Sequence, residues 1–483
     1  ALRGTSISSA KPNGISFRSA SLSLRLDRCA LPCCTCGRHP SANRNVLVYT
    51  PPRPNPLWAV AGLIRTAFGG EGNLLSLLPA AAYRMRIGTL GWSRRMILIV
   101  NAPDLLRGIL TDPADIYPKN DLMVGALAPL VGDSMFVSSG DTWRQQRRMI
   151  DPAFSHMRLN RAFESMSAAV NDYEKHLDRL ALDAEPFSLD LAMSHLTADI
   201  ICRTVFSTSL KSETARDVFD DFSFFERSVA HVELKRLIFD PAWSDIPHHQ
   251  AVLTACERIR SHLGELVDEH IKSGAATFND IATALIAARD LETGATFSRK
   301  ELIDQLGVFF LAGHETTASA LTWAFYILSQ QPQAAQRIRD EVENVCGDSE
   351  VAFEHVKRLT FTRNVFRETM RLYPPITFIP RVAAEATKIG TFDVKKGAMI
   401  MIAPWTIHRH SSLWKNPHAF DPDRFSAARE HELVPGAYIP FGWGPRVCIG
   451  AAFATTESAL ILARLIRRYD FSVDNPDTVR PVA

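Results

Sequence analysis

Helical periodicity dominates the hydrophobic pattern of this 483-residue chain. Apolar residues recur every three to four positions from about residue 100 to about residue 380, which predicts a mainly α-helical protein. Residues 84–90 and 95–100 instead have the composition of β-strands, and the Gly-Trp-Ser segment between them predicts a hairpin. Proline and glycine interrupt the pattern between residues 113 and 140, where we expect an irregular segment and a binding loop. The predicted fold class is mainly α with a smaller β-rich region.

The longest predicted helix begins at Ser298. The segment that starts there reads SRKE, which is a capping box, and Pro332 prevents the helix from continuing beyond about Gln331. About thirty residues with a rise of 1.5 Å each span roughly 45 Å. We therefore expect this helix to cross the whole molecule.

The middle of that helix departs from a good helical sequence. Residues 312–317 read AGHETT, and the glycine alone costs about 1 kcal/mol relative to alanine. Such a local violation is typical of a functional site. Gly313 would allow a flat ligand to approach the backbone, and the hydroxyls of Thr316 and Thr317 can bond to carbonyls one turn earlier. The alternative is a kinked core helix with Glu315 at the surface.

A glycine-rich loop with a single cysteine occupies residues 441–450, FGWGPRVCIG. Gly442, Gly444 and Gly450 allow positive φ angles and close backbone approach. The apolar run that starts at Ile449 has helical periodicity, so Cys448 would sit at a helix N-terminus, where free N–H groups stabilise a thiolate. A metal is the natural partner of that thiolate. A buried structural cysteine is the alternative.

The spacing F-G-x-G-x-R-x-C-x-G resembles the haem-binding loop of the cytochrome P450 family, and specifically its soluble bacterial-type members. This resemblance implies the cytochrome P450 fold for residues 46–483 and haem b as the cofactor. Cys448 would then be the thiolate ligand of the haem iron, and a thiolate ligand favours O–O cleavage. Phe441, Arg446 and Gly450 would contact the haem from the same loop.

Further motifs follow in the order that the family has. By resemblance, Trp143 and Arg147 would bind a haem propionate together with Arg381 and Arg446. The AGHETT segment resembles the oxygen-binding groove of the family. Its residues Ala312 and Gly313 would line the haem, and the acid–alcohol pair Glu315 and Thr316 would deliver protons.

Three more charged residues match a structural element of the family. Glu368, Arg371 and Arg424 would form a buried charge network on the haem side of the core. Asp423 stands where glutamate is more common in the family. The chain ends before a β-hairpin that the family carries, so we expect a truncated C-terminal end.

Composition adds expectations for the first 45 residues. This segment holds seven Lys or Arg and only Asp27 as an acid, without a clear hydrophobic period, so we expect a disordered or non-native extension. An organellar transit peptide is an alternative. Cys29, Cys33, Cys34 and Cys36 with His39 suggest zinc, although their spacing is irregular.

Charge and hydropathy argue against a nucleic-acid partner and against a membrane-spanning helix. The net charge is +2, of which +6 lies in residues 1–45, so the rest is mildly acidic and lacks the basic stripe of a nucleic-acid-binding protein. The sequence has no uncharged apolar run that is long enough for a transmembrane helix, so none is predicted. A short helix at residues 57–68 could still touch a membrane surface. Singly scattered cysteines outside the N-terminal segment favour a reducing compartment. From the resemblance to soluble bacterial-type members we expect a cytoplasmic protein, and we expect a monomer.

We therefore predict a haem-thiolate monooxygenase that inserts one oxygen atom of O₂ into a lipophilic small molecule. Electrons would come from NAD(P)H through separate partners, a ferredoxin and ferredoxin reductase or another donor, with Arg144 and Arg148 near the docking face. A peroxide-dependent peroxygenase and a non-enzymatic haem protein are the alternatives. Apolar candidates for the substrate pocket are Phe309, Ala312, Ile376, Thr377 and Phe378.

Overall fold

The computed structural model describes residues 21–26, 75, 78–90, 96–112, 115–183, 186–229, 246–274 and 277–481. Three predictions lie outside these residues. They are the helix at 57–68, the turn at 91–93 and the proposed zinc ligands at positions 29–39.

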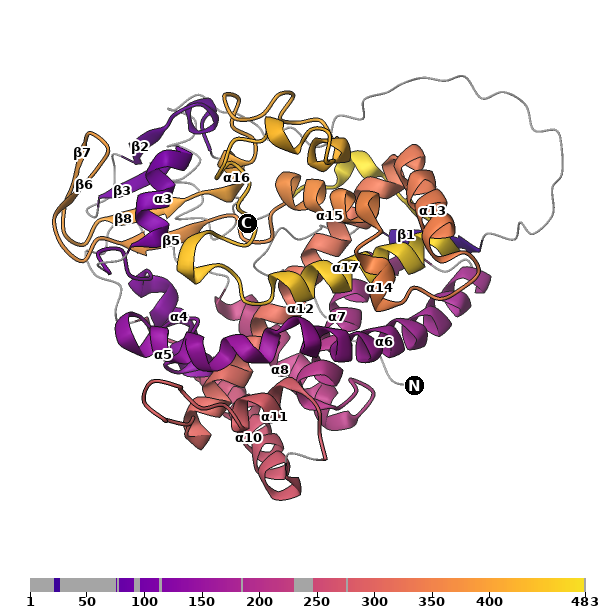
Figure 1. The fold of residues 1–483 in the computed structure, drawn as a ribbon, viewed down its shortest axis with the longest axis horizontal. Coiled ribbons are helices and arrows are strands. Elements are labelled where there is room, and N and C mark those ends of the chain that lie inside the picture. The colour runs from indigo at the N-terminus through magenta and orange to yellow at the C-terminus, as the bar shows by residue number, and fades with distance from the viewer. Residues whose placement is uncertain are drawn as a thin grey trace, which may run out of the picture.

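Helices make up most of the described chain, and Figure 1 shows them filling most of the molecule, with the four-stranded main sheet at one side. The predicted fold class is thus confirmed. The helices are α3 (Pro103–Thr111), α4 (Asp121–Val131), α5 (Gly140–Ile150), α6 (His156–Asp183), α7 (Leu189–Phe206), α8 (Glu213–Val229), α10 (Gln250–Ser273), α11 (Ile281–Ile286), α12 (Arg299–Gln330), α13 (Pro332–Cys346), α14 (Phe353–Val356), α15 (Thr360–Leu372), α16 (Pro404–Ile407) and α17 (Ala451–Arg468).

Short 3₁₀ segments connect several of these helices. They are η1 (Ala80–Tyr83), η2 (Asp151–Phe154), η3 (Pro422–Phe425), η4 (Glu430–Glu432), η5 (Gly444–Arg446) and η6 (Pro476–Thr478). The strands are β1 (Ser21–Leu26), β2 (Ile87–Leu90), β3 (Ile97–Val100), β4 (Phe187–Ser188), β5 (Ile379–Val382), β6 (Thr387–Ile389), β7 (Phe392–Val394), β8 (Met399–Ile402) and β9 (Tyr469–Val473).

The main sheet has the order β2-β3-β8-β5. Strands β2 and β3 pair antiparallel with Ile87 opposite Val100, which confirms the predicted hairpin pairing. Strand β3 then pairs parallel with β8, and β8 pairs antiparallel with β5. The sheet therefore joins the start of the described domain to the segment that carries Arg381.

Helix α12 is the long helix that the sequence predicts. Both bonds of the capping box are present, since Glu301 N–H donates to Ser298 Oγ and Ser298 N–H donates to Glu301 Oε2. Helix α12 runs through the middle of the molecule, with α17 in front of it in Figure 1. Its 32 residues pack most extensively against α7.

The predicted irregular segment at 113–140 is wrong in its middle, where helix α4 forms. The side chain of Asn120 caps this helix by accepting from Leu122 N–H at 2.9 Å. Pro129 lies inside α4 and cannot donate to the carbonyl of Gly125 four residues earlier. His248 Nε2 lies 3.1 Å from that carbonyl oxygen and replaces the missing partner. A tertiary contact thus allows a helix that local sequence disfavours.

Of residues 1–45, for which disorder is predicted, the structure describes only 21–26, and these form strand β1. This strand pairs antiparallel with β9, with Leu22 opposite Val473, and also with β4. The segment reads SLSLRL, an alternation of leucine with polar residues that has the two-residue period of a strand. Residues 1–45 as a whole have a low average hydrophobicity, and this average does not reveal the short alternating stretch.

Candidate active site

The cysteine loop is closed by backbone bonds on both sides of η5. Cys448 N–H donates to the Phe441 carbonyl at 2.9 Å, and Val447 N–H donates to the Gly444 carbonyl at 3.0 Å. Gly442 and Gly444 have φ angles of 77° and 76°, as predicted for this loop. A Cβ at Gly444 would lie 2.5 Å from the carbonyl oxygen of Leu110, so only glycine fits between the loop and α3.

Cys448 precedes α17 by three residues, with Gly450 as the helix N-cap. Gly450 has a φ of −83°, so the predicted positive φ is wrong there, and a Cβ at this position would lie 3.9 Å from Cys448 Sγ. Desolvation by the surrounding protein atoms raises the pKa of Cys448 above its usual value, and a hydrogen bond from the Gly450 backbone and the charge of Arg147 offset this only in part. The protein by itself therefore favours the thiol, contrary to the predicted thiolate at the helix N-terminus. The thiol remains exposed and is a free cysteine. A cationic metal centre would supply the stabilisation that a thiolate lacks here.

Helix α5 presents Trp143 and Arg147 to this loop. The Arg446 guanidinium lies 4.2 Å from the centroid of the buried Trp143 ring. Arg147 Nη1 donates to the Val447 carbonyl at 2.8 Å, and its Nε pairs with Asp151 at 2.6 Å. Arg147 thus binds groups of the protein itself, and its contact with a propionate stays a prediction.

Three cations gather beside the loop without a carboxylate between them. The backbones of Lys119 and Arg381 pair in a β-bridge, and Arg446 acts electrostatically on both side chains. Burial and then the neighbouring arginines lower the pKa of Lys119 well below its usual value, and burial and Arg446 lower the pKa of Arg381 to about 10. In the described part of the chain, Lys119, Arg381 and Arg446 donate hydrogen bonds to the backbone carbonyls of Phe136, Pro380 and Ser138 respectively.

Asp112 and Asp115 act on Arg381 or Arg446 only through their charge, and no described carboxylate forms an ion pair with the three cations. The cluster therefore fits the two propionates of a haem, because a buried dianion would offset the cost of burying the cations. Sequence reasoning named Arg381 and Arg446 but missed Lys119. Its only sequence signal is a lysine before the Asn120 cap, which has no distinctive spacing.

In the AGHETT segment of α12, residues 312–317, the hydrogen bond of Thr316 is as predicted and the surroundings of Gly313 are not. Thr316 Oγ1 donates to the Ala312 carbonyl at 2.8 Å, which is the predicted bond to the previous turn. A Cβ at Gly313, however, would lie 2.5 Å from Cδ1 of Ile201 in α7. The glycine is therefore explained by close packing of two helices, which differs from the predicted approach of a flat ligand.

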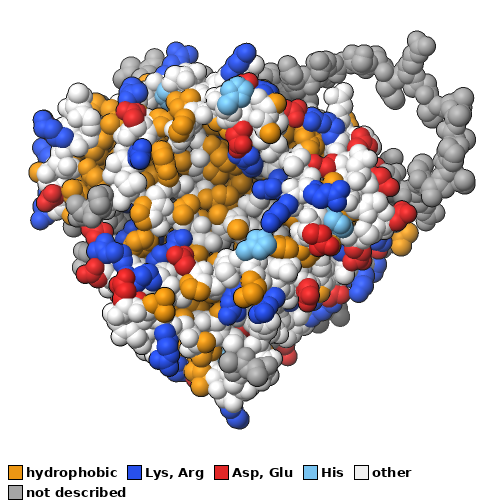
Figure 2. Space-filling view, viewed as in Figure 1, with side chains coloured by type: hydrophobic (Ala, Val, Ile, Leu, Met, Phe, Trp, Pro, Cys, Tyr) orange, Lys and Arg blue, Asp and Glu red, His pale blue; other side chains and the backbone are white. Residues whose placement is uncertain are grey.

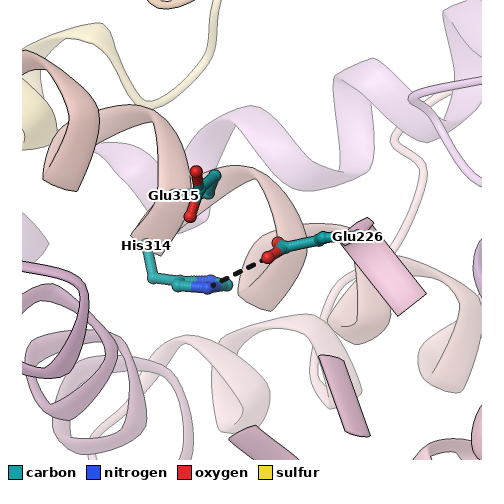
Figure 3. Close-up of side chains that lie close together, drawn as sticks. All are labelled: Glu226, His314 and Glu315. Carbon is teal, nitrogen blue, oxygen red and sulfur yellow. Dashed lines mark ion pairs between the residues drawn. The ribbon is translucent and has the colours of Figure 1, made fainter. Parts of the chain in front are cut away.

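Glu315 belongs to a cluster of three titratable groups. Figure 3 shows His314 of α12 and Glu226 of α8 pointing toward one another, with Glu315 beside them, and all three offer ligand atoms within 4.8 Å of each other. Burial and then the charge of Glu226 raise the pKa of Glu315 to about 8, so its carboxyl holds a proton at neutral pH. Burial lowers the pKa of His314, but Glu226 outweighs it and the pKa rises to about 9. Sequence reasoning missed Glu226, which lies about 90 positions away in the chain.

The charge network lies in the core as described by the family motif. Arg371 forms two bonds with Glu368, at 2.6 and 2.8 Å, and both side chains are fully buried. Arg424 Nε lies 3.3 Å from Glu368 Oε1. Backbone carbonyls, including that of His408 at 2.8 Å, take the remaining Arg371 donors. Asp423 pairs instead with Arg337, so it stands apart from this network.

Hydrophobic side chains gather in a hollow in the middle of the face drawn in Figure 2, between β5 and α15 and above α17. Ile376 belongs to the connection between α15 and β5 and is 44% exposed, which is unusual for a large apolar residue. Phe309 instead packs in the core, with its ring 5.2 Å from that of Phe154, so it does not line the hollow. None of the helices that the structure describes has both the length and the apolar composition of a membrane span.

Comparisons with known proteins agree with this geometry. The pattern of the family Cytochrome P450 matches residues 51–482. Cyclooctatin synthase of Streptomyces melanosporofaciens is 31% identical over 414 residues, which cover 84% of this chain and 87% of the relative. Cyclooctat-9-en-7-ol 5-monooxygenase of the same organism is 32% identical over 372 residues, which cover 76% of this chain and 78% of the relative. The cytochrome P450DA heme domain superposes with a TM-score of 0.70 at 22% identity, covering 82% and 90%, which shows the shared fold.

The helical fold and the cysteine loop thus define a haem-dependent oxygenase. The chain belongs to the cytochrome P450 family. It is a monooxygenase of that family, and haem iron is the cofactor that the family uses.

Proposed function

We propose that this protein holds haem b through the thiolate of Cys448 and inserts one oxygen atom of O₂ into a lipophilic small molecule. The observation that carries the proposal is the composition of one loop. It places Cys448 beside the backbone N–H of Gly450 and, two residues earlier, places Arg446 among buried cations that lack a carboxylate partner. This loop offers a ligand to the iron and positive charge to the propionates.

Haem supplies the activation of O₂, and a thiolate ligand favours cleavage of the O–O bond. The residues of this chain hold the cofactor. Cys448 would be the iron ligand, with Phe441 and Gly450 beside it. Arg381, Arg446 and Lys119 would bind the propionates, and Trp143 holds Arg446 in place through its ring face.

Glu315 and Thr316 would supply protons to the oxygen groove. One oxygen atom enters the substrate and the other leaves as water, which consumes two electrons and two protons. Glu315 holds a proton at neutral pH because burial raises its pKa to about 8. The Thr316 hydroxyl donates its own hydrogen to the Ala312 carbonyl, so the lone pairs of its oxygen are free to accept a hydrogen bond from the groove. This orientation suits a relay through ordered water.

The substrate class follows from the hollow. The hydrophobic side chains that gather in this hollow favour a lipophilic molecule. Two relatives are named after the compounds cyclooctat-9-en-7-ol, a cyclic alcohol, and an ultra-long-chain fatty acid. Hydroxylation or epoxidation of a terpenoid, fatty acid or aromatic compound is therefore the proposal.

Electrons would come from NAD(P)H through a ferredoxin-type donor that docks near α5. Arg144 and Arg148 of this helix both carry ion pairs, with Asp115 and Asp141 and with Asp290 and Glu292 respectively. Reversing both charges should slow reduction by an acidic ferredoxin, and an unchanged rate would exclude this docking face. A cytoplasmic monomer remains part of the proposal.

The absorption spectrum of the reduced, CO-bound protein tests the cofactor assignment. The wild type should show the strongly red-shifted band of thiolate-ligated haem, and Cys448→Ser should lose it. Cys346→Ser, which changes a buried cysteine of α13, is the matched control and should retain the band. A wild-type band at the position usual for histidine-ligated haem would refute the assignment of Cys448.

Turnover experiments test the role of Glu315 and Thr316 separately. With O₂ and a reductase system, Glu315→Gln and Thr316→Val should consume NAD(P)H while forming less product, typically by a factor of 10²–10⁴ for a lost proton donor. Product formation with peroxide alone, unaffected by either substitution, would instead indicate a peroxygenase. Haem binding without turnover under either condition would indicate a non-enzymatic haem protein.

A further inference from the structure

Glu226, His314 and Glu315 have the composition of a metal site that the oxygenation reaction does not require. Their ligand atoms lie within 4.8 Å of one another. Glu226 comes from α8, and the other two come from adjacent positions of α12. Two helices therefore bring one imidazole and two carboxylates to the same point (Figure 3).

Two atoms of this cluster are buried without a hydrogen-bond partner among the described residues. They are Nε2 of His314 and Oε1 of Glu226. His314 Nδ1 lies 2.9 Å from the Phe310 carbonyl oxygen, which fixes Nδ1 as the N–H donor and directs Nε2 at the carboxylates. This is the arrangement in which metal-binding histidines are held by a second hydrogen bond.

His314 Nε2 and Glu226 Oε2 are close enough for an ion pair when His314 is protonated, and their spacing also has room for a bridging metal ion. His314 Nε2 and Glu226 Oε2 are 3.6 Å apart, whereas hydrogen-bonded nitrogen and oxygen atoms lie about 2.7–3.2 Å apart. Two ligands about 2.0–2.1 Å from a tetrahedral zinc ion are separated by about 3.3 Å. The observed gap is therefore close to the separation that a bridging zinc ion requires.

We propose that Glu226, His314 and Glu315 form a binding site for a divalent transition-metal ion of the zinc type. Once the ion displaces the protons of His314 and Glu315, the site offers a neutral imidazole and two carboxylates, and a divalent ion neutralises their two negative charges. The surroundings are apolar, since the rings of Phe310 and Phe219 lie 5.0 and 5.8 Å from that of His314. A nitrogen ligand favours Zn²⁺ over Ca²⁺ and Mg²⁺, which prefer oxygen.

Metal binding would also control proton delivery. An ion bound to the Glu315 carboxylate displaces its proton, so Zn²⁺ becomes a reversible inhibitor of oxygenation. This consequence rests on the proposed function of Glu315, whereas the binding site itself does not.

Zinc binding to the haem-loaded ferric protein tests the site directly. After equilibrium dialysis against Zn²⁺, with an excess of Ca²⁺ present, the wild type should hold about one ion per chain more than Glu226→Gln or His314→Gln. Any zinc held by the cysteines at positions 29–36 is common to all variants and cancels in this difference. The affinity should rise with pH, because protons on His314 and Glu315 compete with the ion.

Asp190→Asn is the matched control. Asp190 of α7 acts on Glu315 through its charge but contributes no ligand atom, so this variant should retain the extra ion. The CO-bound spectrum of each variant verifies folding. Equal zinc content in the wild type, Glu226→Gln and His314→Gln would overturn the proposal. Dialysis does not depend on turnover, so equal zinc contents would not contradict the proposed oxygenation. Conversely, if the wild type lacks the red-shifted CO band, the proposed haem ligation fails while the measured zinc contents still test the metal site.

Discussion

The guanidinium of Arg446 lies over the ring of Trp143, 4.2 Å from its centroid, and donates from Nη1 to the Ser138 carbonyl at 3.0 Å. These contacts connect the cysteine loop to helix α5 across about 300 positions of sequence. They hold a partly buried cation in one orientation, although no carboxylate of the described residues forms an ion pair with it. The contact between Trp143 and Arg446 therefore both stabilises the loop and keeps the Arg446 cation in place to bind an anion.

Substitution of Trp143 should loosen this loop. We expect Trp143→Ala to destabilise the protein by about 3–5 kcal/mol, since it removes a large buried ring, and to accelerate haem loss. Trp143→Phe keeps a ring face for Arg446 and should show smaller effects on both quantities. Chemical denaturation and the rate of haem transfer to an acceptor protein measure them. Equal haem loss from both variants would contradict the role of the ring face.

Lys119→Met should have opposite effects on the haem-free and haem-bound proteins. Removing a desolvated cation should stabilise the haem-free form, because burial and the neighbouring arginines disfavour the charged lysine there. The same change removes a propionate partner and should weaken haem retention. Unfolding curves of both forms give the two values. A loss of stability in both forms would show that Lys119 serves packing alone.

Glu368→Gln should be severely destabilising. It leaves Arg371, which is fully buried, without its carboxylate, and breaking one partner of a buried pair costs about 3–5 kcal/mol. Asp104→Asn, in the exposed pair of Arg86 and Asp104, is the control and should cost at most about 1 kcal/mol. Urea unfolding compares the two. Similar costs for both would mean that the buried network contributes little.

Two loop glycines should differ in their tolerance to alanine. Gly442 and Gly444 both have positive φ angles, but a Cβ at Gly442 meets open space whereas one at Gly444 meets the Leu110 backbone at 2.5 Å. Gly442→Ala should therefore cost about 1 kcal/mol for the left-handed conformation. Gly444→Ala should cost more and reduce haem content, because backbone atoms must move. Haem content per chain and the thermal midpoint distinguish the two.

His270 and Asp280 predict a pH-dependent contribution to stability. Their side chains are buried, with Nε2 and Oδ2 2.8 Å apart. Burial lowers the pKa of His270, but the hydrogen bond and charge of Asp280 outweigh it and raise the pKa above the usual 6.5. The stabilisation is therefore fully present below about pH 6.5 and is lost as pH rises through the raised pKa.

Accordingly, His270→Gln should lose more unfolding free energy at pH 6 than at pH 9, and urea unfolding at both values measures this difference. A larger loss at pH 9 would reverse the sign and contradict the pairing. His249→Gln, which alters the N-cap residue of the same helix, is a suitable control because its side chain makes no cap bond.

The sequence by itself determined the local features of this protein. Helix α12 follows from its capping box and Pro332, and the β2–β3 pairing follows from two short strand-like segments, because these depend on neighbours within a few residues. The cysteine loop was likewise readable, since its glycine spacing encodes the turn geometry directly. The family resemblance added the roles of residues that lie far apart.

Only the tertiary structure decided which distant side chains share a site. Glu226 joins His314 because α8 packs beside α12, and Lys119 joins Arg381 through a β-bridge, neither of which any local period encodes. Helix α4 forms despite Pro129 because His248 supplies the missing bond, and Gly313 serves a contact with α7. Charge, burial and close packing act through space, so their consequences for pKa and ligand binding arise only when the chain is folded.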